Sequence, residues 1–374
     1  MKDEFASAMQ RALGLTRAGD PVAATRAIQE ALAARAGSAG ADPAGMKDVT
    51  PADGAPRTGG QLGAAPLRAR VGKTLGEVVR SLRDGVPGLQ DRVDLPGQRA
   101  ARAAPVVAQG AHFLSRSHSA SAGTRDYRLY RPTTDRPRGL VVMLHGCTQT
   151  PEDFAVGTGM NQVAEAHGLL VAYPGQTNAH NAASCWNWFD PLHQKRGGGE
   201  PEILAGIARD LAAEYGLSHD TVFVAGLSAG GAMAAVLGAA YPDLFAAVGV
   251  HSGLPAGAAN DVVSAFSAMR GGAAPVPRPA PKHRTIVFHG SADTTVHPAN
   301  AAQIAVAAGP VTARIEGRSA GGRRYTRSIH GSGMESWLIE GAGHAWSGGQ
   351  AAGSFTDPLG PDASAEMVRF FLER

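Results

Sequence analysis

Gly226-Leu227-Ser228-Ala229-Gly230 is the stretch that decides the fold. It lies between an apolar, β-branched run at 221–224 and a helical run of small residues at 232–240. Glycines two positions before and after Ser228 permit a strained strand-to-helix turn that raises the serine hydroxyl above the edge of a sheet. The helix that follows directs its N-terminal N–H groups at the same place. In this context the pentapeptide predicts a nucleophile elbow with Ser228 as the nucleophile.

A serine nucleophile needs a base that takes its proton and a carboxylate that holds this base in the correct tautomer. On an α/β-hydrolase sheet the acid and then the histidine follow the serine along the chain. Asp293 stands in the polar loop after the apolar run 285–290, and His344 stands in the loop after the strand-like run 336–340. We therefore predict that Asp293 is the acid and His344 the base of a catalytic triad with Ser228.

Other acidic and histidine side chains compete for these two roles. Asp243 and Asp261 are rivals for the acid, but neither follows a predicted strand. Capping of a turn or a helix is the alternative interpretation of Asp293, because aspartate commonly does this. His289 and His297 flank the acid loop, and we expect them to be packing or supporting groups.

The loop after the apolar run 139–144 is His145-Gly146-Cys147-Thr148-Gln149. At this strand end an α/β-hydrolase supplies half of its oxyanion hole, and the residue after the nucleophile supplies the other half. We therefore assign the backbone N–H groups of Cys147 and Ala229 as the two oxyanion donors. Losing one such donor costs roughly 2.7–4 kcal/mol of transition-state stabilisation. We expect His145 to orient this loop and not to transfer protons.

Four motifs together resemble a known family. They are His145-Gly146-Cys147-Thr148-Gln149, Cys185-Trp186-Asn187-Trp188-Phe189, Gly226-Leu227-Ser228-Ala229-Gly230-Gly231 and Gly343-His344-Ala345-Trp346. In this order they resemble the catalytic domain of the type 1 poly(3-hydroxybutyrate) depolymerase family, an esterase group that includes feruloyl and acetylxylan esterases. The resemblance covers about residues 110–374. It implies the triad Ser228, Asp293 and His344, which the residues themselves already predict.

The resemblance implies that the chain is a serine esterase acting on a short-chain polyhydroxyalkanoate such as poly(3-hydroxybutyrate), on its oligomers or on a related bulky ester. A feruloyl or acetylxylan esterase acting on carbohydrate esters is the alternative, since it would share every catalytic motif. A third hypothesis is a non-catalytic, granule-associated protein, which the complete triad and oxyanion motif disfavour. The Cys and His spacings suggest no metal site, so we expect no metal and no organic cofactor.

The chain has two cysteines, Cys147 in the oxyanion loop and Cys185 before the tryptophan pair. The resemblance implies a disulfide between them, which would pin the oxyanion loop. The alternative is a pair of free thiols, because the first residues of the chain favour a reducing compartment, in which disulfides rarely persist.

Aromatic residues are scarce, at 6% of the chain, so their clustering is informative. Trp186, Trp188 and Phe189 fall in one segment, and Trp346 lies two residues after His344. A hydrophobic ester needs a cleft with rigid apolar walls, and tryptophan provides them with little loss of side-chain entropy. We expect Trp188 and Trp346 to be substrate-binding wall residues, with core packing as the alternative for each.

The N-terminal part of the chain differs in composition from the rest. We predict a helical hairpin over 1–36, a flexible linker rich in Ala, Gly and Pro over 37–105, and the catalytic domain over 106–374. Residues 1–105 carry 15 Lys and Arg against 11 Asp and Glu, a net +4, whereas the remainder carries 20 against 21, a net −1. The catalytic part therefore offers no basic field for nucleic acid. The N-terminal region is our candidate for contact with a polymer-granule surface.

The first residues, Met1-Lys2-Asp3-Glu4-Phe5, are acidic and polar, whereas a signal peptide needs a basic start and an apolar core. No run approaches the ~20 apolar residues that a membrane span needs. We therefore expect a cytoplasmic protein without a transmembrane segment. The alternatives are an extracellular protein exported by a route other than Sec, or a wrongly placed start of the chain.

The order of the expected elements predicts the fold class. Strand-like runs lie near 125–131, 138–145, 169–173, 221–225, 246–250, 285–289 and 335–340, and helical runs near 200–215, 228–241, 299–308 and 361–373. Strands that alternate with helices in this way form a mostly parallel sheet with helices on both faces. We therefore predict an α/β-hydrolase three-layer sandwich, preceded by a poorly ordered, helical N-terminal extension.

Overall fold

The computed structural model describes residues 103–271, 283–331 and 333–373. The helical hairpin predicted over 1–36 and the linker predicted over 37–105, except for its last three residues, lie outside the described residues. Every helix and strand of the described residues falls within the range predicted for the catalytic domain, 106–374.

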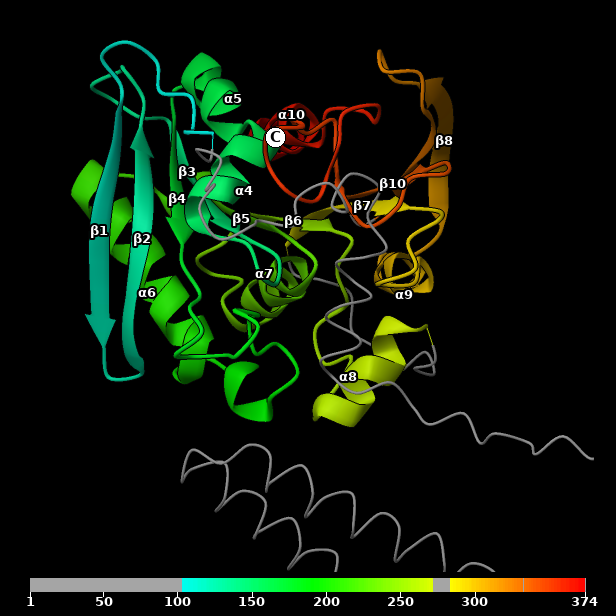
Figure 1. Ribbon diagram of the computed structural model, residues 1–374, viewed down its shortest axis with the longest axis horizontal. Helices are drawn as coiled ribbons and strands as arrows, with labels where there is room; N and C mark the ends of the chain where they lie inside the picture. Colours follow the sequence, from blue (N-terminus) through cyan, green and yellow to red (C-terminus); the bar gives the residue numbers. More distant parts are fainter. Residues whose placement is uncertain (1–102, 272–282, 332, 374) are drawn as a thin grey trace, which may run out of the picture. The chain divides into compact units, whose positions relative to one another are not determined.

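Among the described residues, a 10-stranded sheet has the order β1-β2-β4-β3-β5-β6-β7-β10-β9-β8 (Figure 1). The bounds of these strands are β1 His112–Ala120, β2 Gly123–Arg131, β3 Gly139–Leu144, β4 Leu169–Pro174, β5 Val222–Leu227, β6 Ala247–His251, β7 Arg284–Gly290, β8 Val311–Arg318, β9 Arg324–His330 and β10 Met334–Ile339. Strands β4, β3, β5, β6, β7 and β10 are parallel, and an antiparallel hairpin extends each edge. The carboxyl ends of the parallel strands therefore lie along one edge of the sheet.

The central strands are apolar because both of their faces are covered. Every residue of β3, β4 and β5 is buried, as is usual for parallel strands between two helical layers. Successive side chains of a strand point to opposite faces. Leu140 and Val142 of β3 therefore join one hydrophobic core, and Val141 and Met143 join the other.

Helices cover both faces of the sheet (Figure 1). Their bounds are α4 Pro151–Thr158, α5 Met160–His167, α6 Gly199–Tyr215, α7 Ala229–Ala240, α8 Val262–Met269, α9 Ala299–Val306 and α10 Ala363–Leu372, with short 3-10 helices η1 Pro191–His193 and η2 His219–Thr221. The core that contains Leu140 is closed by α6, α7, α8 and α9, and the core that contains Val141 is closed by α4, α5 and α10. This arrangement is the predicted three-layer sandwich. Among the described residues, no helix has both the length and the apolar character needed to cross a bilayer.

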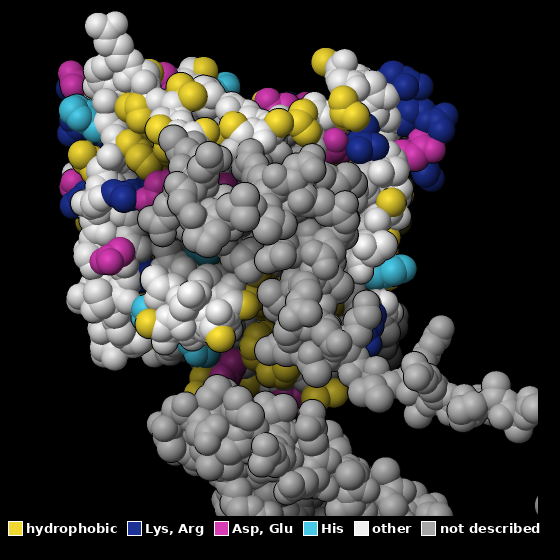
Figure 2. Space-filling view, viewed as in Figure 1, with side chains coloured by type: hydrophobic (Ala, Val, Ile, Leu, Met, Phe, Trp, Pro, Cys, Tyr) yellow, Lys and Arg dark blue, Asp and Glu magenta, His cyan; other side chains and the backbone are white. Residues whose placement is uncertain are grey.

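The edge of the sheet at β8 is exposed and charged. Arg314 and Arg318 lie on β8, and Arg324 on the neighbouring β9 donates to Glu340 at 2.6 Å. Figure 2 shows Lys and Arg side chains beside acidic ones at the upper right, where Figure 1 has β8. Charged side chains on an edge strand oppose pairing with a second sheet.

Candidate active site

Ser228 lies in a tight turn between β5 and α7. Its backbone has φ 57° and ψ −120°, a strained conformation for a residue that carries a side chain. The surrounding glycines are required by space, because a Cβ on Gly230 would overlap the carbonyl oxygen of Leu144. The Ser228 amide donates to the carbonyl oxygen of His251 at 2.9 Å. The chain thus forms the strand, strained turn and helix of a nucleophile elbow, with 8% of the serine exposed.

Asp293 and His344 lie in the loops that follow β7 and β10, which are parallel neighbours in the sheet. His344 Nδ1 donates to Asp293 Oδ2 at 2.8 Å. The other oxygen, Oδ1, accepts the backbone N–H groups of Thr295 and Val296, each at 2.9 Å. In a neutral imidazole whose Nδ1 carries the proton, Nε2 is the basic nitrogen. The contacts of Asp293 therefore hold His344 in the tautomer that a general base needs.

The surroundings of Asp293 favour its ionised form. Burial by itself would raise the pKa of this carboxyl group. The hydrogen bond from His344, the charges of His344 and His289 and the amide of Val296 act in the opposite direction, and the pKa of Asp293 is lowered. His289 Nε2 donates to the Val296 carbonyl oxygen at 2.7 Å and lies 3.5 Å from Asp293 Oδ2. An ionised carboxylate here can stabilise the imidazolium that forms when His344 takes a proton.

His251 joins the elbow to the base loop. Its carbonyl oxygen accepts the Ser228 amide, its Nε2 accepts the N–H of Ser347 at 2.9 Å, and its Nδ1 donates to Ser252 Oγ at 3.2 Å. The imidazole stacks on Trp346 with ring centroids 5.0 Å apart. Burial, reinforced by two nearby histidines, lowers the pKa of His251 well below its ordinary value. His251 is therefore a neutral structural link, which the sequence did not reveal.

The two predicted oxyanion donors have unpaired backbone amides. Cys147 lies in the loop after β3, and Ala229 is the first residue of α7. Within the ranges that the structure describes, neither N–H forms a hydrogen bond. Thr148, next to Cys147, has φ 67° and donates its amide to the carbonyl oxygen of Ala183 at 2.9 Å. Unpaired amides beside a nucleophile can bind a developing oxyanion, and this role of Cys147 and Ala229 stays a prediction.

His145 orients the oxyanion loop. Its Nδ1 donates to the carbonyl oxygen of Gly146 at 2.8 Å, and its Nε2 accepts the backbone N–H of Gln176 at 3.0 Å. Burial lowers the pKa of His145 to about 4. A neutral imidazole with partners on both nitrogens cannot exchange a proton with a substrate, which agrees with the expected orienting role.

Cys147 and Cys185 form a disulfide, with their Cα atoms 4.3 Å apart and a sequence separation of 38 residues. The bond ties the oxyanion loop to the segment that carries Trp186. The indole of Trp186 is fully buried, and its Nε1 donates to the carbonyl oxygen of His145 at 3.1 Å. The sequence did not reveal this second attachment of the loop. Disulfides rarely persist in reducing compartments, and the cytoplasmic location stays a prediction.

The two tryptophans expected to line the cleft are both largely buried. Trp346 is 1% exposed, packs edge-on against Phe154 and donates its Nε1 to Ser364 Oγ at 3.1 Å. The prediction that Trp346 is a wall residue is therefore wrong. Trp346 begins β11 (Trp346–Ser347), whose pairing with β12 (Thr356–Asp357) places the indole between α4 and α10. Trp188 is 5% exposed, and its wall role stays a prediction.

The rival carboxylates have local structural contacts. Asp261 is the N-cap of α8 and accepts the backbone N–H of Ser264 at 2.7 Å. Asp243 forms an exposed ion pair with Arg196. Helix capping and surface pairing explain both aspartates without a role in proton transfer.

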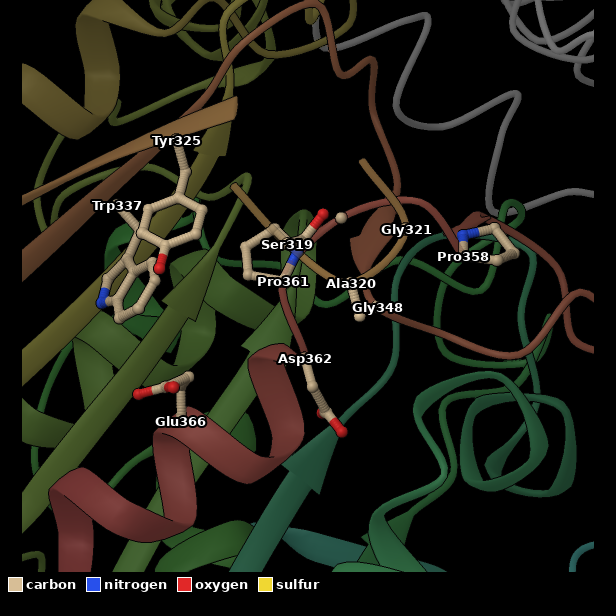
Figure 3. Close-up of a pocket in the computed structure, with 11 residues that line it drawn as sticks. Ser319, Ala320, Gly321, Tyr325, Trp337, Gly348, Pro358, Pro361, Asp362 and Glu366 are labelled. Carbon is tan, nitrogen blue, oxygen red and sulfur yellow. The ribbon is translucent and has the colours of Figure 1, made fainter. Parts of the chain in front are cut away.

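A cavity of about 370 Å³ lies elsewhere in the described part of the chain (Figure 3). Its lining includes the rings of Tyr325 and Trp337, and Glu366 reaches it from α10. No residue of the predicted triad or oxyanion hole lines this cavity. Across the residues that the structure describes, no group of three or more His, Cys, Asp and Glu side chains could hold a metal ion.

Two proteins named as esterases or depolymerases are similar to this chain in sequence. Poly(3-hydroxyalkanoate) depolymerase C of Paucimonas lemoignei is 36% identical over 174 residues, which are 43% of this chain and 42% of that protein. Probable acetylxylan esterase A of Aspergillus fumigatus is 32% identical over 225 residues, which are 55% of this chain and 59% of that protein. The chain thus spans about half the length of these relatives.

A solved structure shows the same fold. Acetyl xylan esterase from Aspergillus awamori aligns with a TM-score of 0.53 at 23% sequence identity, covering 63% of this chain and 94% of the other. Residues 126–328 match the family model described as Esterase PHB depolymerase. The predicted α/β-hydrolase fold and the resemblance to the poly(3-hydroxybutyrate) depolymerase family are therefore confirmed. Because the matched range is more than half of the 374 residues, this chain belongs to the Esterase PHB depolymerase family.

Proposed function

We propose that this protein is a serine esterase that cleaves the ester bonds of a short-chain polyhydroxyalkanoate, poly(3-hydroxybutyrate) or its oligomers. One observation carries the proposal: His344 donates to Asp293 at 2.8 Å at the strand edge where Ser228 occupies a strained elbow. Relatives named as poly(3-hydroxyalkanoate) and poly(3-hydroxybutyrate) depolymerases support the polyester as substrate.

The first half of the reaction forms a serine ester. His344 Nε2 takes the proton of Ser228 as its Oγ attacks the ester carbonyl carbon, and Asp293 stabilises the resulting imidazolium. The N–H groups of Cys147 and Ala229 bind the tetrahedral oxyanion. When the carbon–oxygen bond to the alcohol breaks, His344 gives its proton to the leaving alkoxide. The products of this half are a free hydroxyl end and an acyl group on Ser228.

The second half restores the enzyme. A water molecule loses a proton to His344 Nε2 as it attacks the acyl carbon, and the same two amides bind the second oxyanion. The bond to Ser228 then breaks, and the proton on His344 returns to the serine oxygen. The acid is released, so each cycle consumes one water and one ester bond.

A second candidate function is removal of acetyl or feruloyl groups from carbohydrate. The relatives named as acetylxylan esterases favour it, one of them at 32% identity over 55% of this chain. The catalytic chemistry is the same, so only the substrate separates the two candidates. A non-catalytic granule protein is less supported, because the Asp293–His344 pair and the elbow are both in place.

The substrate is tested by hydrolysis of amorphous poly(3-hydroxybutyrate), p-nitrophenyl butyrate, acetylated xylan and methyl ferulate side by side, with Ser228→Ala as the blank. We expect release of soluble hydroxybutyrate from the polymer and turnover of the small butyrate ester. Fast deacetylation of xylan with an untouched polymer would favour the second candidate. Inactivity on all four esters would contradict both esterase assignments.

A further inference from the structure

A buried carboxylate, Glu200, lies in the first turn of α6 and belongs to no part of the predicted triad. It is 2% exposed. Its Oε2 accepts the backbone N–H of Asn187 at 2.7 Å, and its Oε1 accepts Asn187 Nδ2 at 2.8 Å. Gln176 Nε2 also donates to Oε1. One side chain therefore holds both ends of the segment 176–187 through charge-assisted hydrogen bonds, which are stronger than neutral ones.

The charge of Glu200 is matched by its surroundings. Arg125 on β2 is 3% exposed, and its Nη2 lies 3.8 Å from Glu200 Oε1. The first turn of a helix also favours a carboxylate through the helix dipole. Because buried charges are costly without partners, these contacts keep the carboxylate in one position. Removing the charge would leave Asp126 as the remaining carboxylate that acts on Arg125.

The segment held by Glu200 contacts the oxyanion loop at four points, one of which is the hydrogen bond from the Thr148 amide to the carbonyl oxygen of Ala183 at 2.9 Å. The backbone N–H of Gln176 donates to His145 Nε2 at 3.0 Å, and Trp186 Nε1 donates to the carbonyl oxygen of His145 at 3.1 Å. Cys185, whose carbonyl oxygen accepts Gln176 Nε2 at 3.0 Å, is bonded to Cys147. The contacts of Glu200 with Gln176 and Asn187 thus lead in one step to residues that fix the loop carrying the Cys147 amide.

We propose that Glu200 is a positioning residue, which directs the Cys147 N–H at the oxyanion by holding the segment 176–187. The inference rests on the oxyanion role proposed for Cys147. An oxyanion donor acts on the transition state and much less on the bound ester. A displaced donor therefore lowers kcat and weakens the binding of a transition-state analogue while KM stays nearly unchanged, whereas a smaller folded fraction lowers only the apparent kcat.

The test is Glu200→Gln, measured with p-nitrophenyl butyrate. Glutamine keeps the size of the side chain, but an NH₂ group replaces one of the two acceptor oxygens. This NH₂ group would face the N–H donors of Asn187 or Gln176. We expect kcat to fall roughly 10- to 100-fold, less than for complete loss of a donor, with KM within about threefold. The inhibition constant of a boronic acid, which adds to Ser228 and places an oxygen in the oxyanion hole, should rise by a similar factor.

Glu202→Gln is the matched control, because it removes a carboxylate from the same turn of α6. Glu202 accepts the hydroxyl of Tyr241 at 2.6 Å and pairs with Arg209, outside the segment 176–187. This variant should keep kcat within about twofold of the wild-type value. An equal loss of kcat in Glu202→Gln would overturn the proposal.

Asn187→Ala keeps the proposal testable if Glu200→Gln does not fold. It removes one donor to Glu200, and its kcat should fall without a matching rise in KM. In the double variant the two losses should not add, because both changes break the same contact. Unchanged kcat and boronic-acid affinity in the folded variants would overturn the role of Glu200 alone. A wild-type protein inactive on p-nitrophenyl butyrate would overturn this role together with the proposed function.

Discussion

Replacing Asp293 by asparagine should reverse the tautomer of His344. In the structure, Asp293 Oδ1 accepts two backbone N–H groups, from Thr295 and Val296, each at 2.9 Å. The carbonyl oxygen of an asparagine would take this position, because an NH₂ group there would face two donors. The amide NH₂ would then face His344 Nδ1, which becomes the acceptor, and Nε2 would carry the proton.

A His344 protonated at Nε2 cannot accept the proton of Ser228. The loss in turnover for a reversed tautomer reaches ~10⁴-fold, which corresponds to about 5.4 kcal/mol of transition-state stabilisation. The assay is kcat and KM on p-nitrophenyl butyrate at neutral pH, with circular dichroism to verify the fold. We expect kcat to carry nearly all of the loss.

Asp261→Asn is the matched control, because Asp261 is a carboxylate that caps α8 through Ser264. It should cost about 1 kcal/mol of stability at most and leave kcat near the wild-type value. Near-normal turnover in Asp293→Asn, or a large loss in Asp261→Asn alone, would show that the acid has been assigned to the wrong residue.

The pH dependence of stability, compared between the wild type and Asp293→Asn, tests the charge of Asp293. Its pKa in the folded protein is lowered from the ordinary value of 3.8. The ionised carboxylate therefore stabilises the fold at a pH above the unfolded-state pKa. This contribution is lost as the pH falls from the unfolded-state pKa through the folded-state pKa. Urea unfolding at about pH 5 and about pH 3 should show a steeper loss of stability in the wild type than in Asp293→Asn. Equal losses would mean that folding does not lower the pKa of Asp293.

Two further outcomes concern the disulfide and the N-terminal region. Reduction of the bond between Cys147 and Cys185, which closes a loop of 38 residues, should lower the free energy of unfolding by about 4 kcal/mol on the chain-entropy model. Cys185→Ser should show the same shift in urea unfolding and no further response to reductant, and an unshifted Cys185→Ser would contradict a stabilising bond. A chain that starts at Pro105 keeps the Val106 carbonyl oxygen, which accepts Asn161 Nδ2 at 3.0 Å, so it should hydrolyse p-nitrophenyl butyrate normally. Because it lacks the N-terminal region, it should attach less to polymer granules in a sedimentation assay. An insoluble or inactive truncated protein would move the predicted domain boundary toward the N-terminus.

The parallel strands could be predicted from the sequence, whereas three strands of the two antiparallel hairpins, β1, β8 and β9, could not. The strands β3, β4 and β5 are buried on both faces and read as continuous apolar runs. In contrast, β8 is exposed at nearly every position and carries two arginines. Most residues of β1 are polar. β9 is held by its neighbours and not by an apolar face of its own. Such strands form because they pair with other segments, and this pairing leaves no pattern in the strand's own sequence.

Some residues of the site could likewise be predicted from the sequence, and others could not. Asp293 and His344 follow strands, and adjacent parallel strands bring such loops together, so their contact could be predicted. The supports of the site lack a local signature. His251 accepts a hydrogen bond from Ser347, which is 96 positions away in sequence. The role expected for Trp346 was wrong because proximity to His344 in sequence does not fix the direction of the indole. Burial and hydrogen bonds between distant segments decide these roles.

The most direct test of the central claim is to locate the covalent intermediate. The protein is inactivated with a p-nitrophenyl alkylphosphonate, which reacts with an activated serine, and the labelled peptide is identified by mass spectrometry. We predict one phosphonyl group per chain, on Ser228, with loss of esterase activity in proportion to labelling. Ser228→Ala should stay unlabelled and lose roughly 10³- to 10⁶-fold in kcat. A label on Ser252 or Ser291, or near-normal turnover in Ser228→Ala, would contradict the assignment of the nucleophile.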